Sequence, residues 1–172
     1  PLFAGLLADL FPGLHCPRLS FEKLKIAIEL DFEQTNKKSS EADVFYKQVD
    51  KTIQIYETFQ ARHTIMVVGP TGGGKSVCIE ALQRSCLPAF NDVVKTWYMN
   101  AKAQSLVDLY GEMDPVTRDW TDGILSNVFR NMNRPLITGK ENEKRWLIFD
   151  GDVDALTGTR AIDYGTRDIS FV

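Results

Sequence analysis

The sequence lacks the features of a nucleic-acid-binding or membrane-spanning protein. Its 20 lysine and arginine residues stand against 23 aspartate and glutamate residues, which gives a formal net charge of −3. No stretch is strongly basic, so the usual electrostatic signature of nucleic-acid binding is missing. Purely apolar runs, such as residues 65–68, are no longer than four residues, whereas a membrane-spanning helix needs about 20 mostly apolar positions. We therefore expect neither a nucleic acid nor a membrane as partner.

Cysteine is also scarce, with three residues at positions 16, 78 and 86. Cys78 and Cys86 lie eight residues apart on a predicted helix, which separates them by about 12 Å of axial rise and excludes a disulfide between them. Reduced thiols and the lack of a signal peptide favour an intracellular compartment. Because the chain starts at Pro1, we expect it to be a piece of a longer polypeptide.

What remains is an ordinary globular composition, 44% hydrophobic and 25% charged, with helical and strand patterns in alternation. A capping box formed by Ser40 and Asp43 is expected to start one of the helices. The apolar spacing predicts helices over residues 2–11, 20–32, 43–60, 75–86, 103–109 and 123–133. Strands are predicted over residues 64–68, buried on both faces, and over residues 94–99 and 146–149. This alternation predicts an α/β fold, with a parallel sheet flanked by helices.

A glycine-rich loop carries the strongest functional signal. The loop consists of Gly69, Pro70, Thr71, Gly72, Gly73, Gly74, Lys75 and Ser76. It matches the pattern G-x-x-x-x-G-K-[ST] between a predicted strand and a predicted helix, which is typical of a phosphate-binding P-loop. Backbone N–H groups and the helix dipole would bind the phosphates, Lys75 would reach the β- and γ-phosphates, and Ser76 would bind Mg²⁺. We therefore predict that this loop binds ATP or ADP with Mg²⁺.

A second element of the nucleotide site is an acidic residue after an apolar strand. Asp150 follows residues 146–149 and is the candidate that supports Mg²⁺. Ring-forming P-loop ATPases carry a glutamate at the next position to polarise the attacking water, but this chain has Gly151. Asp152 and Asp154 are displaced along the chain and are interpreted as turn residues. The residues therefore support nucleotide binding but not hydrolysis, and no catalytic residue is predicted.

Three longer motifs resemble one family. Residues 69–76, residues 109–123 (Leu-Tyr-Gly-Glu-Met-Asp-Pro-Val-Thr-Arg-Asp-Trp-Thr-Asp-Gly) and residues 149–156 (Phe-Asp-Gly-Asp-Val-Asp-Ala-Leu) closely resemble the second AAA+ module of dynein heavy chains. Residues 10–17 resemble the connector that enters this module. The resemblance runs from about residue 2 to residue 156, and residues 125–130 are more similar to axonemal than to cytoplasmic dyneins.

The resemblance implies a P-loop NTPase core of the AAA+ class, incomplete at the C-terminus, within the ring of a microtubule motor. Residues 1–40 would form a helical connector, residues 41–156 a partial nucleotide-binding domain, and residues 157–172 a divergent, poorly ordered tail. Implied partners are neighbouring AAA+ modules of the same heavy chain and dynein subunits, without direct microtubule contact from this segment. The implied location is the cytoplasm and cytoskeleton, in particular a ciliary or flagellar axoneme.

Two other interpretations stay open at this point. The chain could be an active P-loop ATPase whose base and arginine finger come from neighbouring modules. It could instead be a structural fragment that binds no nucleotide, because the sequence supplies about three strands where the family implies five. Lys37 and Lys38 are interpreted only as solvated loop residues.

Overall fold

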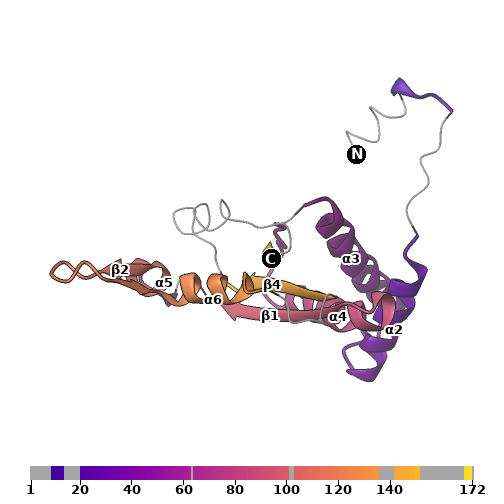
Figure 1. The fold of residues 1–172 in the computed structure, drawn as a ribbon. Helices are drawn as coiled ribbons and strands as arrows, with labels where there is room; N and C mark the ends of the chain where they lie inside the picture. Colours follow the sequence, from indigo (N-terminus) through magenta and orange to yellow (C-terminus); the bar gives the residue numbers. More distant parts are fainter. Residues whose placement is uncertain are drawn as a thin grey trace.

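The computed structural model describes residues 9–13, 20–62, 64–100, 103–135 and 142–151, and the backbone of Ile169–Phe171. Helices pack together at one end of the molecule, and a β-hairpin projects at the other end (Figure 1). The helices at the first end are α2 (Glu22–Gln34), α3 (Ala42–Ala61) and α4 (Lys75–Phe90). In the part of the chain described, no helix is both long enough and apolar enough to cross a membrane.

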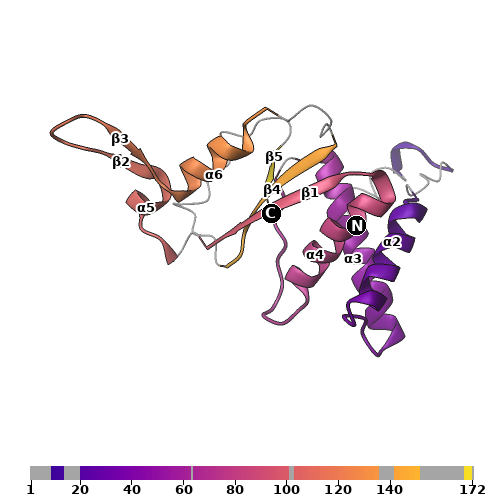
Figure 2. The ribbon, with the colours of Figure 1, turned by 60° about the horizontal axis from the view of Figure 1, so that its bottom comes forward.

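A parallel sheet connects the two ends. Strand β1 (Val93–Met99) pairs in parallel with β4 (Glu143–Phe149), in a register that sets Val93 opposite Glu143 and Met99 opposite Phe149. The other edge of β4 pairs in parallel with β5 (Ile169–Phe171), so the strand order is β1-β4-β5 (Figure 2). These parallel strands and the helices around them confirm the predicted α/β class.

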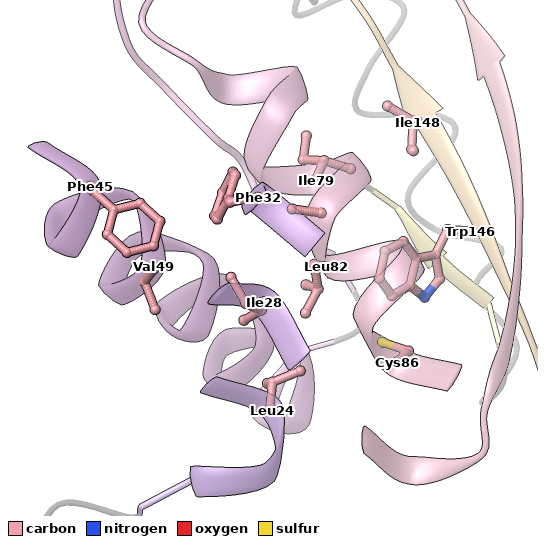
Figure 3. Close-up of a cluster of buried hydrophobic side chains, with 11 residues drawn as sticks. Leu24, Ile28, Phe32, Phe45, Val49, Ile79, Leu82, Cys86, Trp146 and Ile148 are labelled. Atoms are coloured by element: carbon pink, nitrogen blue, oxygen red, sulfur yellow. The ribbon is translucent and has the colours of Figure 1, made fainter. Parts of the chain in front are cut away.

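The main core lies between helices α2, α3 and α4 and one face of the sheet (Figure 3). Leu24, Ile28 and Phe32 of α2 are completely buried, because their spacing of four residues places them on one helix face. Trp146 of β4 stacks on Phe59 of α3, with ring centroids 4.9 Å apart. Burial of this apolar surface is the main force that holds the three helices against the strands.

A smaller core covers the opposite face of the sheet. Leu147 of β4 packs there with Leu109 of α5 (Leu106–Tyr110) and with Leu125 and Met132 of α6 (Ile124–Met132). Successive β4 residues therefore serve opposite cores, as the period of two in a strand requires. Helices α5 and α6 flank an antiparallel hairpin of β2 (Gly111–Met113) and β3 (Trp120–Asp122), which the sequence analysis does not predict.

The predicted buried strand over residues 64–68 is wrong. Only Thr64 forms a β-bridge, and residues 65–70 adopt no regular structure. Ile65 is buried, but Met66 and Val68 are 77% and 82% exposed. Among the described strands, both edges of β4 are already paired, to β1 and to β5. The apolar run therefore finds no free edge of β4, and it connects α3 to α4 as irregular chain (Figure 2).

Helix boundaries differ from the prediction at a few positions. The capping box is wrong, since Glu41 is the N-cap of α3 without a side-chain cap and the Glu41 amide donates to Ser39 Oγ at 3.4 Å. Helix α4 continues past Cys86 to Phe90, with Pro88 in its last turn. The predicted helix over residues 2–11 lies mostly outside the described residues. So does the predicted tail, apart from the three residues that form β5.

Candidate functional site

The glycine-rich loop 69–76 leads directly into α4, as its sequence predicts. Gly72 and Gly74 have φ angles of +77° and +82°, a left-handed conformation that strongly favours glycine. Gly74 is the N-cap of α4, and no side chain caps this helix end. An uncapped N-terminus presents N–H groups and the positive end of the helix dipole, which together suit an anion.

Hydrogen bonds within the loop hold it in a tight turn. The Gly73 amide donates to the Pro70 carbonyl at 3.1 Å. A Cβ atom at Gly73 would lie 3.0 Å from that carbonyl oxygen, so the backbone there leaves little room for a side chain. Lys75 Nζ donates to the carbonyls of Gly69 at 2.9 Å and Pro70 at 2.8 Å. The ammonium group is thus held at the loop, where it must exchange these carbonyls for phosphate oxygens when it binds a nucleotide.

The acidic residue lies at the carboxyl end of the sheet. Because β1 and β4 are parallel and in register, they end side by side, and the Asp150 amide donates to the Met99 carbonyl at 3.0 Å. Asp150 is exposed. The carboxyl edge of a parallel sheet is the usual ligand-binding edge of α/β folds.

The structure does not join the two predicted halves of the site. Loop residues 69–76 surround the N-terminus of α4, and Asp150 follows β4, but no hydrogen bond or ion pair connects them among the described residues. Residues 65–68 form no strand of the sheet, so no regular strand leads into the loop. The residues fit a phosphate group at the loop, where Ser76 lies in the first turn of α4, and Asp150 lies at the carboxyl edge of the sheet.

Asn100 is a residue that the sequence analysis missed. It follows β1, next to Gly151, which has a φ of +131°. A Cβ atom on Gly151 would lie 3.2 Å from both polar atoms of the Asn100 amide group. The sequence offers one indication of this position. Because residues 94–99 and 146–149 are predicted to be parallel strands, the residues that follow them must lie at the same edge of the sheet.

Ion pairs of Lys37 and Lys38 form a second feature that the sequence does not predict. Lys37 Nζ lies 2.7 Å from Glu80 Oε2, so Lys37 is not simply solvated. Lys38 likewise pairs with Glu33 at 2.7 Å and lies over the Phe45 ring.

Burial raises the pKa of Tyr98 in β1, and the nearby carboxylates of Glu80 and Asp150 raise it further.

The two cysteines of α4 do not contribute nucleophiles. Both Cys78 and Cys86 are free and buried, which confirms that they form no disulfide with each other. Burial raises the pKa of the Cys86 thiol to about 12, and it also raises that of Cys78. At neutral pH these thiols stay protonated and act as small apolar groups of the core.

Comparison with known proteins agrees with the resemblance seen in the motifs. A family model described as the hydrolytic ATP binding site of dynein motor region matches residues 1–76. The chain is 49% identical over 156 residues to dynein axonemal heavy chain 10 of Homo sapiens. It is 47% identical over 157 residues to the dynein-1-alpha heavy chain of the flagellar inner arm I1 complex of Chlamydomonas reinhardtii. Over most of its length, the chain is similar to a segment of dynein heavy chains.

The matches cover most of this chain but little of each dynein. Each of these two alignments includes 91% of the chain and only 3% of the relative. Similarity extends to the cytoplasmic dynein 2 heavy chain 1 of Mus musculus, at 34% identity over 152 residues. The family model ends at Ser76, so it includes the whole glycine-rich loop but neither Asp150 nor Gly151. The comparison therefore supports an ATP-binding loop without bearing on the hydrolytic residue.

Proposed function

We propose that this segment is an ATP-binding module of a dynein motor ring that does not itself hydrolyse ATP. The observation that carries the proposal is the loop 69–76, whose left-handed glycines and uncapped α4 N-terminus present backbone donors to a phosphate group. Gly151 supports the second half of the proposal, since a residue without a side chain cannot polarise water.

Each residue of the module would have a separate task. Lys75 would transfer its ammonium from the Gly69 and Pro70 carbonyls to the β- and γ-phosphates. Mg²⁺ would neutralise phosphate charge, with Ser76 as its ligand and Asp150 behind it. Because Lys75 Nζ already lies at the loop, whereas Asp150 would act only from behind the metal, we expect Asp150 to contribute less to affinity than Lys75. Residues 1–40 would connect this domain to the preceding module.

At the level of the parent protein, we propose a heavy chain that moves along microtubules in a ciliary or flagellar axoneme. The axonemal and flagellar relatives support this assignment. Partners of this segment would be neighbouring AAA+ modules and other dynein subunits. The net charge of −3 supports the absence of direct contact with the acidic microtubule surface.

An active ATPase is the alternative, and the description of the family model as hydrolytic favours it. The match ends before Gly151, however, so it does not contradict the inference that the catalytic carboxylate is missing. Single-turnover release of phosphate from MgATP separates the two possibilities. We expect no release above buffer from this chain, and robust release would overturn the non-hydrolysing assignment.

Binding itself is tested with Lys75→Ala. MgATP at a hundredfold excess over its dissociation constant should stabilise the unmodified chain by about 2.7 kcal/mol, measured as a thermal shift. Lys75→Ala should lose most of this shift, because it removes the charge aimed at the phosphates. Lys51→Ala is the matched control, since Lys51 lies on α3 and bonds to Gln54 of the same helix. A flat response of the unmodified chain would favour a structural fragment without nucleotide.

A further inference from the structure

Four charged side chains form a continuous network between α2 and α4. Arg84 binds both oxygens of the Asp31 carboxylate through one edge of its guanidinium, with Nε 2.6 Å from Oδ1 and Nη2 2.9 Å from Oδ2. Arg84 Nη1 also lies 3.5 Å from Glu80 Oε2, and Lys37 Nζ lies 2.7 Å from the same oxygen. The Asp31 side chain is only 11% exposed. A bidentate pair of this kind fixes orientation as well as distance.

Apolar packing beside the network also joins α2 to α4. Ile28 and Phe32 of α2 belong to the same buried cluster as Ile79 and Leu82 of α4. Packed cores shift between discrete arrangements rather than deform continuously. A rotation of α4 therefore either carries α2 along or breaks the pair of Asp31 and Arg84.

The network also lies close to the phosphate end of α4. Glu80 is four residues after Ser76, about 6 Å along the helix axis. Its carboxylate would repel a phosphate group unless it is neutralised. Lys37 and then Arg84 supply this charge, and their hydrogen bonds lower the pKa of Glu80. The pair of Glu80 and Lys37 thus connects the charge balance of the loop to the end of α2.

We propose that Asp31 and Arg84 are positioning residues that couple nucleotide binding at loop 69–76 to helix α2. This inference rests on the proposed function. Nucleotide binding restrains the first turn of α4, and the ion pair transfers this restraint to α2, which precedes the nucleotide-binding loop in the chain. Because coupling between two sites is reciprocal, displacement of α2 would in turn weaken nucleotide binding.

Hydrogen exchange of the α2 amides in the 172-residue chain, with and without saturating MgATP, tests this coupling. In the unmodified chain we expect MgATP to slow α2 exchange by at least about fivefold, the lower end of typical allosteric couplings. Arg84→Ala should still bind MgATP, with slowed exchange in the first turn of α4, but should lose the slowing in α2.

Two further variants guard against a general loss of structure. Arg84→Lys keeps the charge but not the bidentate fork, so it should lose part of the slowing even if Arg84→Ala does not fold. Lys38→Ala is the matched control, because it breaks an ion pair of 2.7 Å with Glu33 of α2 that does not involve α4. This control should keep the full response.

The outcomes separate this inference from the proposed function. MgATP binding without any slowing in α2, or full slowing in both Arg84→Ala and Arg84→Lys, would overturn the coupling and leave the binding function intact. No MgATP binding by the unmodified chain would overturn both.

Discussion

Position 151 shows how one residue determines what the site can do. Gly151 lacks a side chain, and its φ of +131° is one that other residues rarely adopt. A Cβ atom at this position would lie 3.2 Å from the Asn100 amide group, so the Asn100 side chain would have to shift slightly to make room for it. The site therefore lacks a carboxylate and also lacks the backbone geometry that would accept one.

We predict that Gly151→Glu does not create an ATPase. A base at the right place typically raises a rate by about 10²–10⁴-fold, but charge on the γ-phosphate also needs compensation, for which an arginine finger contributes about 10³–10⁵-fold. We expect no rise in single-turnover phosphate release and a loss of about 1–3 kcal/mol in stability from the forced φ angle.

Gly151→Ala separates these effects, because it imposes the same backbone strain without a carboxylate. Adding Asn100→Ala to Gly151→Glu should recover part of the stability by clearing the space. Robust turnover by Gly151→Glu alone would show that the missing base is the only defect.

The sequence could predict the glycine-rich loop because its functional residues are contiguous and carry their own backbone requirements. Lys75 and Gly74 need no distant partner to be recognised. Asn100 could not be predicted in the same way, because its position beside Gly151 depends on the pairing of Met99 with Phe149 across the sheet. The pair of Asp31 and Arg84 likewise joins residues 53 positions apart.

At the scale of elements, the hairpin β2–β3 depends on two glycines at its base. A Cβ atom at Gly111 would lie 2.2 Å from the Thr121 carbonyl oxygen, and one at Gly123 would lie 2.5 Å from the Leu109 carbonyl group. Both distances are far too short for real contacts. The close approach of the backbones therefore explains why glycine stands at each position.

We predict that Gly111→Ala opens the hairpin. The φ of +110° at Gly111 and the contact with Thr121 both oppose a side chain, so the loss in unfolding free energy should exceed the roughly 1–3 kcal/mol of backbone strain alone. Urea unfolding measures this loss. Gly13→Ala is the control, because its φ of +86° is similarly strained but its Cβ would meet no atom within 4 Å. Equal losses in the two variants would contradict the role of the close contact.

The apolar periodicity correctly predicted α2, α3 and α6 and strands β1 and β4, because these elements pack apolar side chains into the two cores. It failed for residues 65–68. A run of β-branched and apolar residues can pair as a strand, but it needs a neighbouring strand with a free edge. The residues of the run themselves do not show whether such an edge is available. The hairpin was not predicted because β2 and β3 are each three residues long, which is too short to show an alternation of apolar and polar residues.

At the scale of the whole molecule, one carboxylate connects the sheet to the arm formed by α5, α6 and the hairpin. Glu143 is buried and binds Lys95 of β1 at 2.7 Å and Arg145 of β4 at 3.0 Å. Arg145 in turn donates to the carbonyls of Met132 and Arg134 at the end of α6. These contacts hold the last turn of α6 against β4.

This arrangement predicts a pH dependence of stability. The hydrogen bond from Lys95, followed by that from Arg145, lowers the pKa of Glu143. Its contribution to stability is therefore complete above the pKa of an unfolded glutamate, about 4.3, and is lost as the pH falls through the lower folded value. Glu143→Gln should be less stable by about 1 kcal/mol at pH 7, because a charged hydrogen bond becomes neutral.

The difference between Glu143→Gln and the unmodified chain should then shrink as the pH decreases below about 4. Urea unfolding at several pH values measures it. Glu41→Gln removes an exposed carboxylate that caps no helix N–H group and serves as the control. A difference that stays constant with pH would contradict the role assigned to the Glu143 charge.

The hairpin arm lies within the residues that separate β1 from β4 along the chain, and this position has a kinetic consequence. Strands β1 and β4 can pair only after residues 100–142 have closed into a loop, and the entropy lost in closure increases with loop length. Contacts between α5, β2, β3 and α6 are local, so they can form before the strands meet. Early formation of the arm shortens the chain that must still be closed. We therefore expect the arm to accelerate the search that aligns the two strands of the sheet.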